Sequence, residues 1–143
     1  MEKVLNGEGS ANQLGEGLKA CVDAGRAVLF APRKLTLRDG SADLLRGVVQ
    51  TLGEAGFVDI TLDLSGCQYV DSAGLRELVT AFTFCRQKKG SFSLNSLPKK
   101  IYDLLQITRL YTVFSHSNVD YSSHPTFELY PQDISALKAA RGT

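Results

Sequence analysis

Apolar and polar residues alternate along this chain with two different periods. Between 58 and 64, apolar side chains occupy every second position at Ile60, Leu62 and Leu64, which is typical of a strand with one buried face. From about 73 to 89 the apolar residues recur every three or four positions, as in a helix with one buried face. They are Leu75, Leu78, Val79 and Phe82. The chain therefore turns from strand to helix near residue 71.

The same two periods predict the other elements. Strands are expected at 27–31, 34–38 and 91–94, with a short last strand at 111–114. Helices are expected at 10–24, at about 41–56 and from about 98 onwards, and a brief one at 133–140. The expected helix at 10–24 would place Leu14, Leu18, Cys21 and Val22 on one face. Strands that alternate with helices predict an α/β or α+β domain, in which helices cover a sheet.

Composition narrows the function classes. The 143 residues are 43% hydrophobic and 22% charged, with a net charge of +1, which suits one soluble globular domain and gives no support for nucleic acid as a partner. No apolar run is long enough for a membrane span, and the first residues lack a secretory signal, so the expected location is the cytoplasm. The three cysteines show no metal-binding spacing and are expected to be reduced. No metal or cofactor is expected.

The turn between strand and helix carries the sequence Asp71-Ser72-Ala73-Gly74-Leu75. In the simplest interpretation, Asp71 or Ser72 caps the helix, and Gly74 lets the backbone pass closely. A nucleophilic serine is poorly supported, because the turn lacks the G-x-S-x-G pattern and no histidine is an evident partner. The chain is therefore not expected to be an enzyme.

A third interpretation makes Ser72 the acceptor of a phosphate from an outside kinase. A helix N-terminus tolerates the added negative charge, whereas the neighbouring Asp71 and an apolar partner surface would not. Arg76 lies four residues on, where it could pair with the phosphate or simply be a solvated charge.

The flanking residues carry a family resemblance. Residues 60–75 read ITLDLSGCQYVDSAGL, which resembles the signature of STAS domains, the family of bacterial anti-sigma factor antagonists and of sulfate-transporter cytoplasmic domains. Residues 97–108, LPKKIYDLLQIT, and the pair Val113 and Phe114 are similar to the penultimate helix and last strand of that family. The resemblance covers roughly residues 26–117. It implies a mixed sheet of four to five strands with helices mainly on one side.

The resemblance also implies a function. An antagonist of this kind binds an anti-sigma factor, which is itself a serine kinase that binds ATP, and phosphorylation of the serine matching Ser72 releases the complex. Asp71, Gly74, Leu75 and Arg76 would join Ser72 in partner binding. The alternative is a structural STAS subunit of a stress-signalling or lipid-transport complex, in which Ser72 is not phosphorylated. Arg76, where many members have a small residue, and the segment 34–41 depart from the family pattern.

The expected organisation is an N-terminal extension at 1–25, a STAS domain at 26–120 and a C-terminal tail at 121–143. One further residue stands out. Phe84 points away from the apolar face formed by Leu75, Leu78 and Phe82, so it is expected either to be covered by an extension of the chain or to belong to a partner site.

Overall fold

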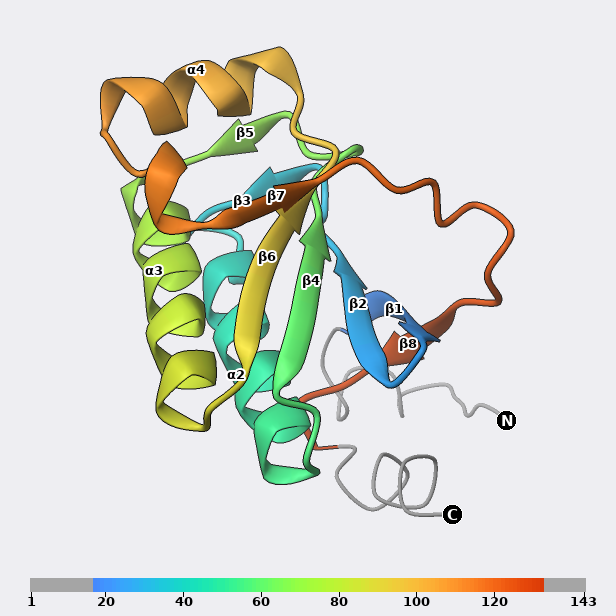
Figure 1. Cartoon of the computed structure of the whole chain (residues 1–143). Coiled ribbons are helices and arrows are strands. Elements are labelled where there is room, and N and C mark those ends of the chain that lie inside the picture. Colours follow the sequence, from blue (N-terminus) through green and yellow to red (C-terminus); the bar gives the residue numbers. More distant parts are fainter. Residues whose placement is uncertain (1–16, 133–143) are drawn as a thin grey trace.

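The computed structural model describes residues 17–132, and its centre is a six-stranded mixed sheet with the strand order β7-β6-β4-β2-β1-β8 (Figure 1). Four strands are parallel to one another: β2 (Arg26–Phe30), β4 (Asp59–Asp63), β6 (Ser91–Asn95) and β7 (Ser115–Ser117). β1 (Leu18–Asp23) is antiparallel to β2, and β8 (Phe127–Leu129) is antiparallel to β1. The predicted fold class is confirmed, and the sheet has six strands where four to five are expected.

Two helices, α2 (Ser41–Glu54) and α3 (Ser72–Gln87), pack against each other on one face of this sheet (Figure 1). A second, two-stranded sheet pairs β3 (Lys34–Leu35) with β5 (Tyr69–Val70), and α4 (Lys99–Ile107) lies beside β5. Within residues 17–132, no helix has the length and apolar character needed to cross a membrane. β5 of the small sheet ends at Val70, directly before α3 begins at Ser72, so the small sheet positions the first turn of α3.

The two faces of the main sheet differ in chemistry. On the helix side, Leu29, Ile60 and Leu94 are fully buried in the main core, together with apolar residues of α2 and α3. Side chains alternate between the faces of a strand, so the intervening residues of β4 and β6 point to the opposite face. These residues are polar: Thr61, Asp63, Ser93 and Asn95. The sheet therefore has one apolar face and one partly polar face.

The predicted helix at 10–24 is wrong for the part of it that the structure describes. Leu18–Asp23 forms β1, which pairs with β2 from Lys19 opposite Phe30 to Asp23 opposite Arg26. The two-residue turn between them has positive φ at both positions, 52° at Ala24 and 81° at Gly25. This is the backbone of the hairpin turn that matches the twist of two antiparallel strands. Residues 10–16 of the predicted helix lie outside the described residues.

The predicted strand at 111–114 is also wrong. Tyr111–Val113 forms a short 3-10 helix, and the strand starts only at Ser115. The Tyr111 ring stacks on the imidazole of His116, with 4.0 Å between ring centroids, and meets Tyr102 of α4 edge to face. Aromatic packing against α4 therefore holds these residues in a turn. The predicted C-terminal helix at 133–140 lies outside the described residues.

Phe84 is covered from within the chain. Its ring lies so close to Gly53 of α2 that a β-carbon there would stand 2.4 Å from the ring, and the Lys88 ammonium lies 5.3 Å from the ring centroid. The ring is half-buried, and the segment that covers it is α2, which is part of the domain and not the expected extension of the chain. Cys21, Cys67 and Cys85 are free and buried, as expected of reduced thiols.

Candidate functional site

The turn into α3 is held by Asp71, which is the N-cap of the helix. Its Oδ1 accepts a hydrogen bond from the Gly74 N–H at 2.8 Å, and its Oδ2 accepts one from the Leu37 N–H at 3.1 Å. The first bond satisfies one of the free N–H groups of the first helical turn. The second bond ties the helix to the loop that follows β3. Asp71 therefore fixes two segments that are far apart in the sequence.

Ser72 is the first residue of α3, and its side chain is exposed. Within residues 17–132, its hydroxyl has no hydrogen-bond partner, because the carboxylate of Asp71 provides the cap. Of the two residues that the sequence proposes as caps, only Asp71 performs this role. The serine hydroxyl is therefore free to react with or bind an external group.

Gly74 allows α3 to start directly against the small sheet. A β-carbon at this position would lie 2.3 Å from the carbonyl oxygen of Leu35 and 2.7 Å from a methyl carbon of Val70. Both distances are far below van der Waals contact, so only glycine fits between the helix and the strands. The close passage predicted for Gly74 is what the structure shows, and it places Ser72 at the end of β3 and β5.

The remaining predicted site residues differ in their exposure. Arg76 is exposed, and its side chain has no hydrogen-bond or ion-pair partner in the described part of the chain. Leu75 is half-buried and packs against the main core, whereas Gly74 is buried. Ser72 and Arg76 are therefore accessible to another molecule, and Gly74 and Leu75 mainly position the turn.

The loop between β3 and α2 completes the site, and sequence reasoning missed its connection to Ser72. Asp39 accepts hydrogen bonds from the hydroxyl of Thr36 at 2.8 Å and from the N–H of Ser41 at 2.9 Å. The Ser41 hydroxyl also donates a hydrogen bond to Asp39. This bond is the largest cause that lowers the pKa of Asp39 below its ordinary value, followed by the Ser41 N–H and the Thr36 hydroxyl. Hydrogen bonds to two carboxylates therefore stabilise the loop: those to Asp39 lie within it, and the one to Asp71 joins it to α3.

Two large apolar side chains flank the turn in exposed positions. Leu37 is 56% exposed and Tyr69 is 54% exposed. Tyr69 also lines a shallow hollow of about 340 Å³ with Lys34, Arg38 and Asp71. Only Tyr69 lies next to the turn in the sequence, so the sequence gives no signal that Leu37 and Arg38 belong to the same surface. Around the turn the structure thus assembles exposed apolar side chains, the three cations Lys34, Arg38 and Arg76, and the carboxylates of Asp39 and Asp71.

An ion pair under the turn joins α2 to α3. The Arg46 guanidinium contacts the Glu77 carboxylate through two nitrogens, the shortest contact being 2.7 Å. Glu77 is only 3% exposed, and a buried carboxylate needs such a partner. This pair, which sequence reasoning also missed, fixes the two helices relative to each other.

Neither histidine supports a nucleophilic serine. The Nε2 atom of His116 contacts the backbone oxygen of Tyr111 at 2.5 Å, and that of His124 lies 3.4 Å from Asp23. In the described part of the chain, no histidine therefore forms a pair with Ser72. The same residues contain no group of three or more potential metal ligands.

The titration of Asp71 offers a test of this geometry. The Gly74 N–H, as the largest cause, lowers the pKa of the Asp71 carboxyl from 3.8, and the Leu37 N–H adds to the effect. The contribution of Asp71 to folding is thus present above the unfolded pKa and is lost as the pH falls through the lower folded value. We expect carbon-detected NMR to give a midpoint below 3.8 for Asp71. A midpoint at or above 3.8 would contradict the cap.

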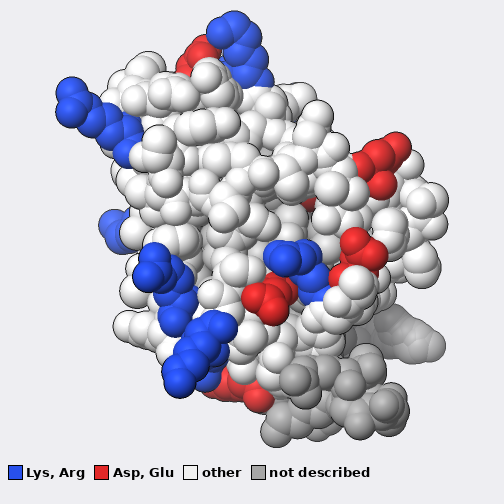
Figure 2. Space-filling model, in the orientation of Figure 1, with Lys and Arg blue, Asp and Glu red and all other residues white. Residues whose placement is uncertain are grey.

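Charged side chains form no continuous patch on the face drawn in Figure 2. Blue and red residues are scattered over this face and adjoin at the top, near the centre and at the lower edge, with white atoms between these small groups. This distribution agrees with the low net charge of +1 and offers no basic stripe for a nucleic acid on this face.

Comparisons with known proteins agree on one family. A family model described as Mlab, STAS domain matches residues 35–115. A Thermotoga maritima protein assigned as a candidate anti-sigma factor antagonist has a similar structure, with 23% identity, 71% of this chain and 86% of that chain covered, and a TM-score of 0.64. No curated protein sequence matches the chain significantly.

Two further solved structures share the fold. An anti-sigma-factor antagonist (STAS) domain protein from Planctomyces limnophilus is 17% identical, with 88% of this chain and 98% of that chain covered and a TM-score of 0.59. The anti-sigma factor antagonist SpoIIAA in its unphosphorylated form is 10% identical, with 85% and 94% covered and a TM-score of 0.53.

Proposed function

We propose that this chain, which belongs to the STAS domain family, is a partner-switching protein that binds an anti-sigma factor and is released when that kinase phosphorylates Ser72. The observation that carries the proposal is the division of roles at the turn. Asp71 caps α3, so the Ser72 hydroxyl is exposed and has no partner among residues 17–132. A serine that served only as the cap would have its oxygen engaged with the helix backbone.

The surroundings of Ser72 suit a switch of this kind. A phosphate adds about −1.5 to −2 charges at neutral pH, next to Asp71 and near the exposed Leu37 and Tyr69. The helix N-terminus tolerates that charge, so the fold would persist while an apolar, desolvated contact with the partner would not. Arg76 is available to pair with the phosphate.

The proposal extends to the rest of the molecule. The chain itself performs no catalysis, and ATP binds to the kinase. We place the STAS domain at 26–120, with β1 and β8 adding strands to its sheet from the flanking segments, and we assign the protein to the cytoplasm of a bacterium. The family of the solved relatives supports this assignment.

Ser72→Glu is expected to weaken binding of the partner on the order of tenfold or more, while Ser72→Ala binds like the wild type and accepts no phosphate. The test uses a purified anti-sigma factor kinase from the same genome, with ATP, phosphosite mapping by mass spectrometry and binding by calorimetry. Ser123, an exposed serine of the loop before β8, provides the matched controls Ser123→Ala and Ser123→Glu, which should leave both measurements unchanged.

Two results together would contradict the proposal that phosphorylation of Ser72 releases the partner. If the kinase binds but Ser72 never carries phosphate, and Ser72→Glu binds as tightly as the wild type, the turn is a constant contact surface. The chain would then be a structural STAS subunit of a stress-signalling or lipid-transport complex.

A further inference from the structure

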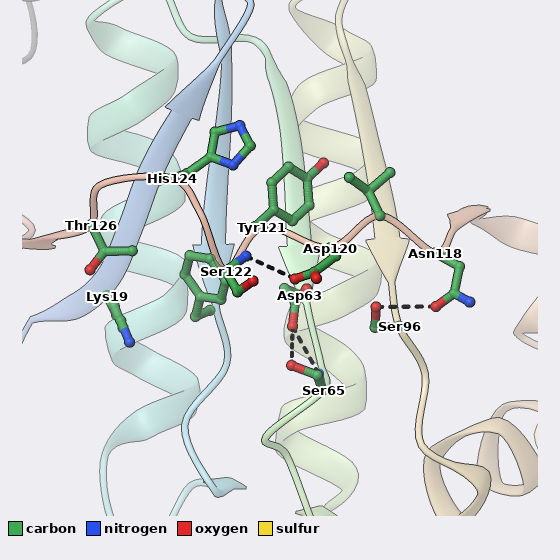
Figure 3. Close-up of a pocket in the computed structure, with 12 residues that line it drawn as sticks. Lys19, Asp63, Ser65, Ser96, Asn118, Asp120, Tyr121, Ser122, His124 and Thr126 are labelled. Carbon is green, nitrogen blue, oxygen red and sulfur yellow. Dashed lines mark hydrogen bonds between the residues drawn. The ribbon is translucent and has the colours of Figure 1, made fainter.

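The partly polar face of the main sheet carries a hollow of about 640 Å³ that does not include the Ser72 turn (Figure 3). Residues at or just beyond the carboxyl ends of all four parallel strands line it: Phe30, Asp63, Ser96 and Asn118. The loop at 118–126 crosses this face and contributes Asp120 and Tyr121 (Figure 3). Carboxyl ends of parallel strands are a common place for ligands, and the volume is that of a small-molecule site.

Asp63, at the carboxyl end of β4, is 4% exposed. Its oxygens accept hydrogen bonds from the Ser65 N–H at 2.9 Å, the Ser65 hydroxyl at 2.6 Å and the side-chain amide of Asn95 at 2.6 Å. All of these donors are uncharged. Within residues 17–132, no cation forms an ion pair with Asp63, although buried carboxylates are usually paired with one.

A second carboxylate and one cation line the same hollow. The backbone N–H of Ser122, 2.9 Å away, is the largest cause of the lowered pKa of Asp120, which keeps this carboxyl ionised. The Lys19 ammonium lies over the Phe30 ring, 5.8 Å from its centroid, and forms no ion pair in the described part of the chain. The hollow therefore combines two carboxylates, one ammonium, the imidazole of His124 and an aromatic wall.

From this lining we propose that the hollow binds a small molecule that carries an ammonium group. The ammonium would pair with the carboxylates of Asp63 and Asp120, which form no ion pair with Lys or Arg within residues 17–132, and the rings of Phe30 and Tyr121 would favour its alkyl chain. If the ligand also carries a carboxylate, Lys19 is the group that receives it. The proposal stands apart from the role of Ser72, because no residue of the turn lines the hollow.

Three four-carbon compounds with different end groups test the proposal on the full chain. Putrescine has two ammonium groups, 4-aminobutyrate has one ammonium and one carboxylate, and succinate has two carboxylates. We expect putrescine or 4-aminobutyrate to give saturable NMR shifts at the amides of Ser65, Asp120 and Ser122, with a dissociation constant of about 1 mM or lower, and succinate to give none. Tighter binding of 4-aminobutyrate would assign a zwitterion, with Lys19 as the carboxylate partner, and tighter binding of putrescine would assign a polyamine.

Variants identify the groups that bind. Asp120→Asn, at an exposed loop position, should fold normally and weaken the binding about threefold to fivefold, and Asp63→Asn should weaken it further. Asp103→Asn on α4, outside the hollow, should have no effect. The proposal fails if neither amine gives saturable shifts up to about 20 mM, if succinate binds equally well, or if Asp120→Asn binds like the wild type.

Discussion

Replacing Gly74 with alanine is expected to lower the free energy of unfolding by about 3 kcal/mol, at the upper end of what overpacking costs. The added β-carbon would lie 2.3 Å from the backbone oxygen of Leu35. Because the oxygen belongs to β3, relief requires the first turn of α3 to move away from the small sheet. That movement would also strain the Asp71 bond to the Leu37 N–H. Urea unfolding followed by circular dichroism measures the loss.

Gly66→Ala is the matched control for this substitution. Gly66 lies between β4 and β5, and a β-carbon there would meet no atom within 4 Å. The same chemical change in open space should alter the free energy of unfolding by less than about 1 kcal/mol. If Gly74→Ala were as stable as Gly66→Ala, the tight contact between α3 and β3 would not be a rigid feature of the fold.

Asn95→Ala is expected to cost a similar amount, about 3 kcal/mol, for a different reason. The side chain is fully buried and makes four hydrogen bonds. Its amide nitrogen donates to Asp63 at 2.6 Å and to the Val119 oxygen at 2.9 Å, and its oxygen accepts from the Ser117 hydroxyl and the Val119 N–H. Alanine would leave the buried carboxylate and the loop at 118–126 without these partners.

An exposed asparagine of the same region provides the comparison. Asn118 accepts one hydrogen bond from the Ser96 hydroxyl at 3.2 Å, and Asn118→Ala should change the free energy of unfolding by no more than about 0.5 kcal/mol. Equal effects of the two substitutions in urea unfolding would show that the four bonds of Asn95 contribute little. A double-mutant cycle with Asp63→Asn then measures the coupling between Asn95 and Asp63.

Long periodic segments could be predicted from the sequence, and short segments held by distant contacts could not. The strand at 58–64 and the helices at 41–56 and 73–89 agree with β4, α2 and α3 to within a few residues, because each has a continuous buried face. β8 has only three residues, of which Leu129 alone is buried, and its pairing partner β1 lies at the other end of the described chain. No local pattern reports such a pairing.

The error at β1 has a specific cause. Helical spacing fits Leu14, Leu18, Cys21 and Val22. In the structure, however, the strand β1 lies between β2 and β8, and its buried side chains are those of Leu18, Ala20 and Cys21. The hairpin turn that fixes this strand uses Ala24 at a position with positive φ, where asparagine or glycine is the usual signal. With alanine in that place, the turn is hard to recognise from the sequence.

The position of the turn follows from the sequence, but its contacts do not. The strand-to-helix pattern places Ser72 at the start of a helix, and the sequence does not decide between Asp71 and Ser72 as the cap because both residue types serve equally well. The bond from Leu37 to Asp71 joins residues that are 34 positions apart. The hollow on the other face requires the register of four strands and the path of a loop, which periodicity does not contain.

The pairing of β1 with β8 means that one edge of β1 stays unpaired until late in the synthesis of this protein. Of the strands in residues 17–132, β1 leaves the ribosome first and is followed directly by β2 in the hairpin, whereas its other edge, from Leu18 to Ala20, pairs with residues 127–129. Until those residues emerge, the nascent chain carries an open sheet edge of the kind that recruits chaperones or foreign strands. Its protection depends on β8, the last strand to be made among those that the structure describes.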